Sequence, residues 1–230
     1  MRRILNDRRL IYPLVLAMYV GGLGVTAYLY HLDRQQQRAQ ARDDLLQAVG
    51  LIRAGIEQQV NTSLNLTAGM VIYVAANPAI TQEQFAVAAS RILRRMPYVR
   101  SMSLAKDNVV SHLYPLEANR QALGQRLLEV PQQRDAVLRA IEWKHSVIAG
   151  PVDLEQGDRS FIGRIPIYLD KERTRYWGLA SVVMNVDGFF RAAGIERFST
   201  DFDVALRGKD SQGAAGAVFY GDPTLFDRSD

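Results

Sequence analysis

A run of twenty residues without a charged side chain, IYPLVLAMYVGGLGVTAYLY at residues 11–30, constrains this chain more than any other feature. A helix rises about 1.5 Å per residue and the hydrocarbon core of a membrane is about 30 Å thick, so the run is long enough to cross it. Residues 1–10 contain four arginines and one aspartate. Positive charge favours the cytoplasmic side of a membrane helix. We therefore expect a cytoplasmic segment 1–10, a transmembrane helix 11–30 in the inner (plasma) membrane, and a main domain that is periplasmic or extracellular.

A cleaved signal peptide is the alternative interpretation of this run. Val25 and Ala27 have the small-x-small spacing of a cleavage site, and three glycines lie within residues 21–24. We favour an uncleaved anchor, because the run has the full length of a membrane span and a helical pattern follows it at once.

The net positive charge is concentrated in the first residues. The chain carries +4, of which residues 1–30 contribute +3 (four arginines against one aspartate), so the other 200 residues carry only +1. A nucleic-acid-binding domain needs a basic surface on its folded part, so we predict no nucleic-acid partner. The chain has no cysteine, and His31, His112 and His145 are far apart. These counts predict no disulfide framework, no metal site and no cofactor.

Residues 31–76 contain no proline and predict a stalk helix. Their apolar residues recur with the 4-3-4 spacing of a coiled-coil seam at Leu45, Val49, Ile52 and Ile56. The lower half of the stalk is too polar to be buried in a core, so this narrow stripe predicts a parallel homodimer. A single helix that packs on its own domain is the alternative, and we expect it for the upper half.

Residues 77–190 have the helix and strand signals of a compact domain. Thr81 and Gln84 have the spacing of a capping box, which predicts the start of a helix. A second helix is predicted after Pro131, with Val137, Leu138 and Ile141 on its inner face. The predicted strands are 98–105, 109–115, 146–154, 160–168 and 176–186. This order is typical of an α+β fold, an antiparallel sheet with helices on one face.

Three sequence blocks, LYPLEANRQALGQRL, AGPVDLEQGDRSFIGRIPIY and RYWGLASVVMNVDGFF, resemble the CHASE domain family. The resemblance covers roughly residues 35–230, with the blocks in the family's order and spacing. It implies an extracellular sensor module of a membrane-bound signalling protein, in which a long helix leads into two PAS-like sheets and the membrane-distal sheet holds the ligand. Residues 77–190 would then form the distal subdomain, and residues 191–230 the truncated start of the proximal one.

The sequence predicts no enzyme activity for these residues. Ser103 and Lys106 match an S-x-x-K spacing, but they lie on a predicted strand, whereas acyl-transfer chemistry needs this motif at a helix start. In bacterial members of the family, a second membrane span leads to a histidine kinase or to a cyclic-di-GMP enzyme. We expect any catalysis by the full protein to lie in such a domain, beyond residue 230.

Arg164 interrupts the apolar strand FIGRIPIY and is the first candidate ligand-binding residue. Strand alternation places Arg164 on one face with Ile162 and Tyr168, and both faces of the strand are largely apolar. A buried arginine needs a partner, and a ligand carboxylate or phosphate would suit a guanidinium. The alternatives are solvent exposure and a structural ion pair with Asp153, Glu155 or Asp158. The resemblance implies that Arg164 occupies a polar position that lines the ligand site.

Four further ligand-binding candidates follow from the resemblance. Tyr114 and Asn119 begin the segment that covers the sheet in the family, and a core position and a turn cap are their respective alternatives. Gln133 matches the position at which plant cytokinin receptors have an adenine-binding aspartate, and it departs from that pattern because an amide carries no charge. Ser181 is a candidate hydroxyl group on the last strand, with a half-buried structural serine as the alternative.

The sequence therefore predicts a membrane-anchored sensor domain that binds a small, potentially anionic molecule and passes the signal through a dimeric stalk. The alternative is a single-pass membrane protein whose ectodomain binds another protein and has no small-molecule ligand. A cavity lined by Arg164 and other polar groups would favour the sensor, and a dry, packed interior would favour the alternative.

Overall fold

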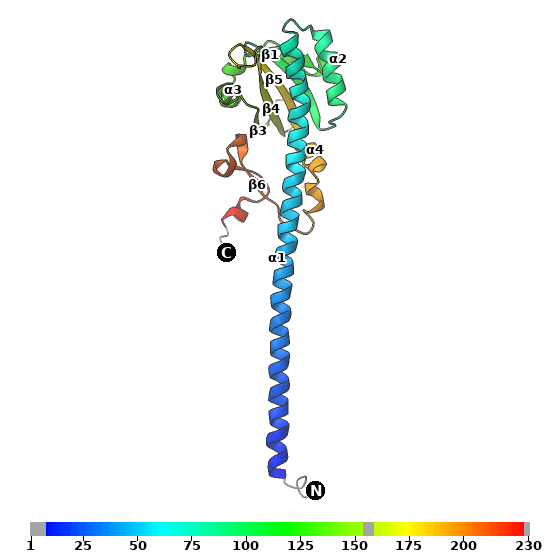
Figure 1. Ribbon diagram of the computed structural model, residues 1–230, viewed down its shortest axis with the longest axis vertical. Coiled ribbons are helices and arrows are strands. Elements are labelled where there is room, and N and C mark those ends of the chain that lie inside the picture. The colour runs from blue at the N-terminus through cyan, green and yellow to red at the C-terminus, as the bar shows by residue number, and fades with distance from the viewer. Residues whose placement is uncertain (1–7, 154–158, 228–230) are drawn as a thin grey trace. The chain divides into compact units, whose positions relative to one another are not determined.

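The computed structural model describes residues 8–153 and 159–227 (Figure 1). The chain divides into two compact units, residues 1–50 and residues 51–230. Helix α1 (Arg8–Ala76) begins in the first unit and ends in the second.

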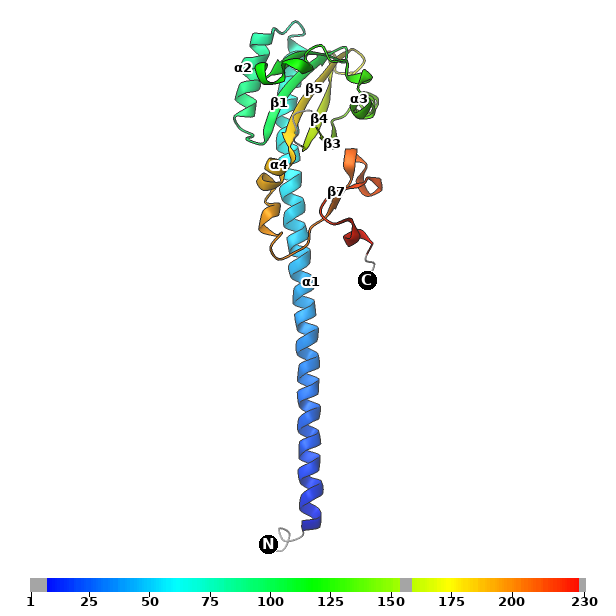
Figure 2. The same ribbon diagram turned by 180° about the vertical axis from the view of Figure 1, so that it is seen from behind.

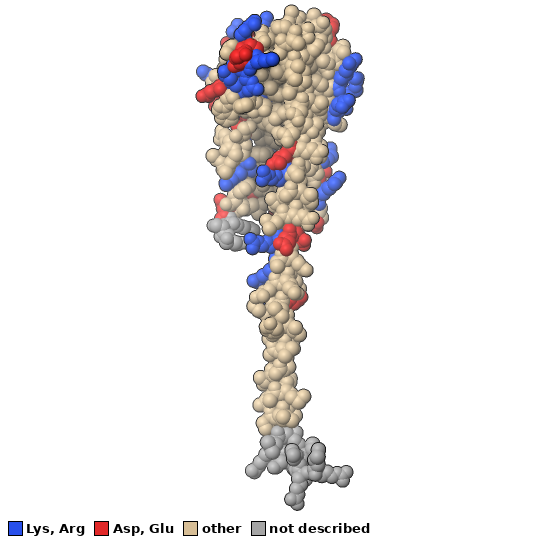
Figure 3. Space-filling view, in the orientation of Figure 1, with Lys and Arg blue, Asp and Glu red and all other residues tan. Residues whose placement is uncertain are grey.

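The first unit contains the apolar part of α1. The side chains of residues 13–30 are exposed, and on the face shown in Figure 3 this stretch presents no charged side chain. In the part of the chain that the structure describes, one helix is long and apolar enough to cross a membrane. The prediction of a long N-terminal apolar helix is confirmed.

The second unit is built on a five-stranded antiparallel sheet with the order β2-β1-β5-β4-β3 (Figures 1 and 2). The strands are β1 (Val99–Lys106), β2 (Val109–Tyr114), β3 (Val147–Asp153), β4 (Arg159–Tyr168) and β5 (Tyr176–Asn185). In the central pair, Arg164 of β4 lies opposite Ser181 of β5. The predicted α+β class is confirmed, since an antiparallel sheet with flanking helices follows a long apolar helix.

The upper part of α1 and helix α2 (Gln82–Leu93) cover one face of the sheet. Their side chains form a buried cluster with the strands that includes Met70, Val74, Phe85, Ala89, Met102 and Leu104. Gly163 of β4 faces α1, and a Cβ atom added there would lie 3.4 Å from Leu64 and 2.9 Å from Val182. The glycine therefore lets the helix approach the strand closely. The predicted capping box is present, with Thr81 and Gln84 each accepting the other's backbone N–H.

The predicted coiled-coil seam is divided between two environments. Leu45 and Val49 are 46% and 54% exposed, whereas Ile52 is only 6% exposed. Ile52 lies in a core cluster with Phe189 and Phe190, and Ile56 packs against the same cluster. The seam therefore does not continue past Val49 as a free surface, because the upper helix packs on its own domain.

Helix α3 (Pro131–Trp143) covers part of the opposite face of the sheet. The expectation of helices on one face only is therefore wrong. The inner face of α3 is also displaced from the predicted one, since Val137 is fully buried but Leu138 is 43% exposed. Ala136 and Ala140 take the inner positions, and such small side chains bring the helix close to Ala105 and Leu179.

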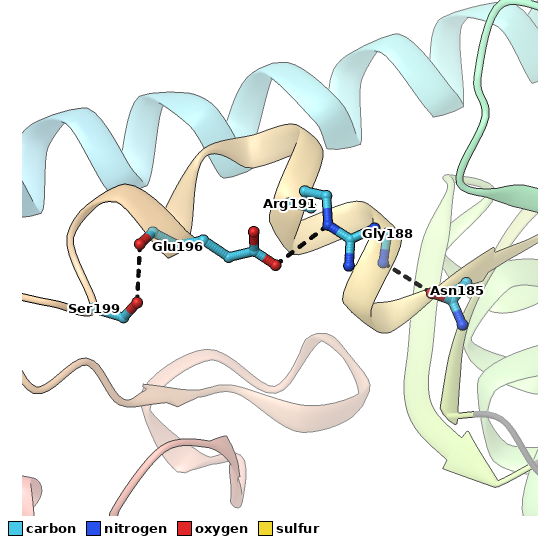
Figure 4. A network of polar contacts seen from close by, with 5 residues as sticks. All are labelled: Asn185, Gly188, Arg191, Glu196 and Ser199. Atoms are coloured by element: carbon cyan, nitrogen blue, oxygen red, sulfur yellow. Dashed lines mark hydrogen bonds and ion pairs between the residues drawn. The ribbon is translucent and has the colours of Figure 1, made fainter.

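The segment after the sheet begins with helix α4 (Val186–Ala193), shown in Figure 4. The side-chain oxygen of Asn185 caps this helix by accepting the backbone N–H of Gly188 at 2.8 Å. Nε of Arg191 lies 3.4 Å from the carboxylate of Glu196. The backbone carbonyl of Glu196 accepts a hydrogen bond from the hydroxyl of Ser199 at 2.9 Å. These contacts shape the connection between the sheet and the C-terminal segment.

The C-terminal segment forms a small two-stranded sheet, β6 (Leu206–Arg207) with β7 (Val218–Tyr220). Between its strands, the short helix η4 (Lys209–Ser211) lies against the free edge of β3. The hydroxyl of Ser211 accepts the backbone N–H of Ile148 at 3.2 Å and donates to its carbonyl at 2.7 Å. The carboxylate of Asp210 accepts the N–H of Gly150 at 2.7 Å. The side chains of Ser211 and Asp210 thus form hydrogen bonds with backbone groups at the edge of β3, as a further strand would.

Candidate functional site

A cavity of about 300 Å³ lies on the face of the sheet that α3 only partly covers. Its floor is formed by side chains of β1, β5 and β4. Its walls are formed by residues of β2, by Asp153 of β3, and by residues 119–133, which run from within the short helix η1 (Glu117–Ala122) to the start of α3. The polar lining consists of Ser101, Ser103, Asn119, Gln121, Gln125, Gln132, Gln133, Asp153, Arg164 and Ser181.

Arg164 is the most deeply buried charged group of this cavity, with 1% of its surface exposed. Its Nη2 donates to the side-chain oxygen of Gln133 at 2.6 Å. Its Nε and Nη1 are buried and have no hydrogen-bond partner among the described residues. The solvent-exposed alternative for Arg164 is therefore wrong. A buried guanidinium with two unpaired nitrogens in a cavity wall is the arrangement expected of an anion site.

No acid among the described residues forms an ion pair with Arg164. Burial lowers the pKa of Arg164 to about 10, and the carboxylate of Asp210 opposes this shift. The side chain still carries its positive charge at neutral pH. Asp153 lines the same cavity, but it does not bond to Arg164 in the described part of the chain. Glu155 and Asp158, the other predicted ion-pair partners, lie outside the described residues.

The structure brings four of the five predicted site residues together. Arg164, Gln133, Asn119 and Ser181 all line the cavity, and Asn119 also donates to the carbonyl of Pro115 at 2.9 Å. Asn119 thus has the turn-capping role that the sequence offered as the alternative to ligand binding, and it also borders the cavity. Tyr114 is not among the lining residues and packs against the apolar cluster on the α1 side of the sheet.

Sequence reasoning missed the serines of β1. Ser101 and Ser103 line the cavity because they alternate with Met102 and Leu104, which are buried on the other face. The alternation SMSL was visible in the sequence. It signals a strand with one polar and one apolar face. The pairing of Gln133 with Arg164 had no such signal, because the two residues are 31 positions apart.

A second hollow, of about 250 Å³, lies among Phe161, Phe189, Phe190 and Phe219. Within the described residues, none of the buried unpaired polar atoms belongs to its lining. No group of three or more potential metal ligands was found in the described ranges. The cavity around Arg164 differs from this hollow in having a buried charged group with two nitrogens that lack a partner among the described residues.

Solved structures with a similar fold are sensor domains. The chain resembles an extracellular ligand-binding receptor from Desulfohalobium retbaense with a TM-score of 0.58 and 13% identity, over 78% of this chain and 32% of the receptor. It also resembles the ligand-binding domain of the Campylobacter jejuni chemoreceptor Tlp3, solved in complex with L-norvaline, with a TM-score of 0.53 and 11% identity, over 78% of this chain and 68% of that domain. The match thus spans about a third of the first receptor's length, and at these identities the likeness is one of fold.

The family is identified by a direct match to the sequence. No curated protein sequence matches the chain. The family model of the CHASE domain matches residues 105–220, which is half of the chain. This stretch contains β2 to β5, α3 and every predicted site residue. The chain belongs to the CHASE domain family.

Proposed function

We propose that this chain is the membrane-anchored sensory part of a signalling receptor, and that the cavity around Arg164 binds a small molecule with an anionic group. The observation that carries the proposal is the guanidinium of Arg164, which is 1% exposed and has two nitrogens without a partner. Burying a charge without a partner costs several kcal/mol in general. A family of sensor modules supplies the context, and we assign this chain no catalytic step.

Gln133 leaves Arg164 available to a ligand. As a neutral acceptor it binds one N–H of Nη2 and so orients the guanidinium, but it does not neutralise the charge. The second N–H of Nη2 then forms a fork with a neighbouring nitrogen, and such a fork matches a carboxylate or a phosphate. The neighbouring hydroxyl of Ser181 and the amide of Asn119 would contact the rest of the ligand.

The location of the domain is part of the proposal. The apolar helix, together with the arginines before it, supports a cytoplasmic N-terminus and a sensor domain on the other side of the inner membrane. Within the domain, residues 77–190 would form the membrane-distal, ligand-binding subdomain and residues 191–230 the start of the proximal one. Residues 31–76 would form the stalk of a homodimer, with Leu45 and Val49 on the shared surface.

Strand β4 offers a route from the ligand to the stalk. Arg164 faces the cavity, and its neighbour Gly163 faces Leu64 of α1 on the opposite side of the sheet. A ligand that draws Arg164 into the cavity would shift β4 against α1. A ligand changes an equilibrium only by its different affinities for two states, so the stalk arrangement would follow that difference.

An ectodomain that binds another protein remains the competing function. It would require a cavity filled by the protein's own side chains, and an open volume of about 300 Å³ with a charged wall argues for the sensor. L-norvaline, which the Campylobacter jejuni neighbour binds, is one candidate among small carboxylates.

Thermal unfolding of the full chain in detergent micelles tests the proposal. The panel contains small carboxylates, inorganic phosphate, amino acids including L-norvaline, and adenine derivatives. A ligand at about a hundred times its dissociation constant stabilises by about 2.7 kcal/mol, which for a domain of this size raises the melting temperature by roughly 5–11 °C. We expect an anion to produce this shift in the natural protein and not in Arg164→Met. A shift that survives Arg164→Met, or no shift from any anion, would favour the protein-binding alternative.

A further inference from the structure

Three cavity residues form a polar row straight across three neighbouring strands. Ser103 of β1 is paired with Ser181 of β5, and Ser181 is paired with Arg164 of β4. All three side chains line the cavity. Adjacent strands lie about 4.8 Å apart, so the Cα atoms of Ser181 and Ser103 follow that of Arg164 at about 5 and about 10 Å.

Neither hydroxyl group of this row is bonded to another described residue. Among the described residues, the side chains of Ser103 and Ser181 take part in no hydrogen bond, and Ser181 is only 5% exposed. A serine hydroxyl both donates and accepts a hydrogen bond, so each of the two can exchange hydrogen bonds with a ligand group. Together with the unpaired nitrogens of Arg164, the row therefore presents one cation and two neutral hydrogen-bonding groups to whatever occupies the cavity.

The rest of the lining restricts the body of a ligand. The apolar side chains of the cavity are aliphatic, and none of the described lining residues is aromatic. A planar base would therefore find no ring to stack on. The carboxylate of Asp153 lies outside the row, on the strand position paired with Arg159. An ammonium group placed along the row would meet only neutral hydroxyls.

We infer that the ligand is an aliphatic hydroxy acid that lies across β4, β5 and β1, with its carboxylate on Arg164 and its hydroxyl groups on Ser181 and Ser103. This inference rests on the proposed function, because it assigns the orientation and chemical class of a ligand at the same site. The carbon chain lies beside Ile162 and Val183, the aliphatic side chains of the floor, and each hydroxyl group exchanges hydrogen bonds with one serine.

Matched probes separate the parts of the ligand. D-gluconate, threonate and glycerate carry a carboxylate and hydroxyl groups, hexanoate carries the carboxylate without hydroxyls, and sorbitol carries the hydroxyls without the charge. Calorimetric titration of the full chain in detergent micelles is expected to show that at least one hydroxy acid binds about tenfold or more tightly than hexanoate, sorbitol and L-norvaline. Failure of all three hydroxy acids to bind, or equal or tighter binding of hexanoate or L-norvaline, overturns the inference.

Serine variants test the row itself. Ser103→Ala and Ser181→Ala are each expected to lower the affinity for the hydroxy acid by about fivefold to tenfold, because each removes one hydrogen bond. Neither is expected to change the affinity for hexanoate. Ser160→Ala is the matched control, because Ser160 is a buried serine of β4 that is not among the residues lining the cavity. Equal losses in all three variants, or no loss in the two row variants, overturn the assignment.

The outcomes also distinguish this inference from the proposed function. If Arg164→Met abolishes the binding of every carboxylate while Ser103→Ala and Ser181→Ala have no effect, the anion site is retained. The hydroxy acid lying across the strands is then rejected. Binding of D-gluconate that is unchanged in Arg164→Met rejects both. The serine variants are expected to fold, since each removes a hydroxyl group that makes no hydrogen bond with the described residues.

Discussion

At the scale of the residue, Arg164 has a cost to folding, to which the proposed function adds a use in binding. Burial lowers its pKa to about 10, so the folded protein holds a charge that its surroundings disfavour. Replacing a buried charged group by an apolar one of similar volume is often neutral or stabilising. We expect Arg164→Met to keep or raise the free energy of unfolding, by up to about 1 kcal/mol or about 2–4 °C in melting temperature, while anion binding is lost. A lower melting temperature in the absence of ligand would instead assign Arg164 a structural role.

Gln133 gives a second test at this scale, because a single isosteric change alters its charge. Gln133→Glu places a carboxylate 2.6 Å from Nη2, where the amide oxygen now lies. A buried charge pair would form, so we expect a higher melting temperature without ligand and an affinity for anions that falls by tenfold or more. Gln132→Glu, on the neighbouring lining residue that makes no bond to Arg164, is the control. An equal loss of anion affinity in both variants would indicate that any negative charge in the cavity repels the ligand, rather than that the new carboxylate occupies Arg164.

The pKa of Arg164 also predicts how anion binding depends on pH. The folded-state pKa of about 10 lies below the usual value of an arginine, because burial disfavours the charged form. An anion needs that charged form, which stays fully populated at neutral pH and is lost as the pH rises through about 10. We expect the affinity for a carboxylate to be constant between about pH 6 and about pH 9 and to fall above about pH 10. A decline near neutral pH would place the controlling group elsewhere.

At the scale of the element, the contact between η4 and the edge of β3 holds the C-terminal segment beside the strand next to Arg164. Ser211→Ala removes both hydrogen bonds to Ile148, at 3.2 and 2.7 Å. We expect amide exchange of residues 147–153 to become about fivefold faster, which corresponds to about 1 kcal/mol. Ser199→Ala is the matched control, since its hydroxyl binds the carbonyl of Glu196 instead (Figure 4). Unchanged exchange in Ser211→Ala would mean that the edge is protected by other contacts.

The elements also show which parts of the site could be predicted. Period-two alternation placed Arg164 on the same face as Ile162, which also lines the cavity, because a strand fixes the direction of every second side chain, whereas Ser181 came from the family resemblance. The inner face of α3 was mispredicted because Leu138 is more hydrophobic than Ala136 and Ala140, whereas close packing on the sheet favours the smaller side chains. Tyr114 was assigned to the site although its ring packs on the α1 side, and strand periodicity alone does not say which face holds a ligand.

At the scale of the whole molecule, the proposed dimer is tested at the stalk surface that two copies would share. The proposed shared surface is short, since Leu45 and Val49 are exposed while Ile52 belongs to the core of its own domain. The chain has no cysteine, so a single introduced cysteine would be the only thiol. Facing cysteines form a disulfide only when their Cα atoms lie within about 7 Å of each other. Crosslinking therefore tests the seam residue by residue.

In membrane vesicles that contain the full chain, we expect Leu45→Cys and Val49→Cys to form disulfide-linked dimers under mild oxidation. Gln47→Cys is the control, because Gln47 is exposed and lies about 200° around the helix from Leu45. Ile52→Cys is expected to remain monomeric, since its side chain is 6% exposed inside its own domain. Equal crosslinking at Gln47 would reflect random collision, and crosslinking at Ile52 would mean that the upper helix leaves its domain in the dimer. A ligand that changes the ratio of the Leu45 and Val49 crosslinks, but not in Arg164→Met, would connect the cavity to the stalk.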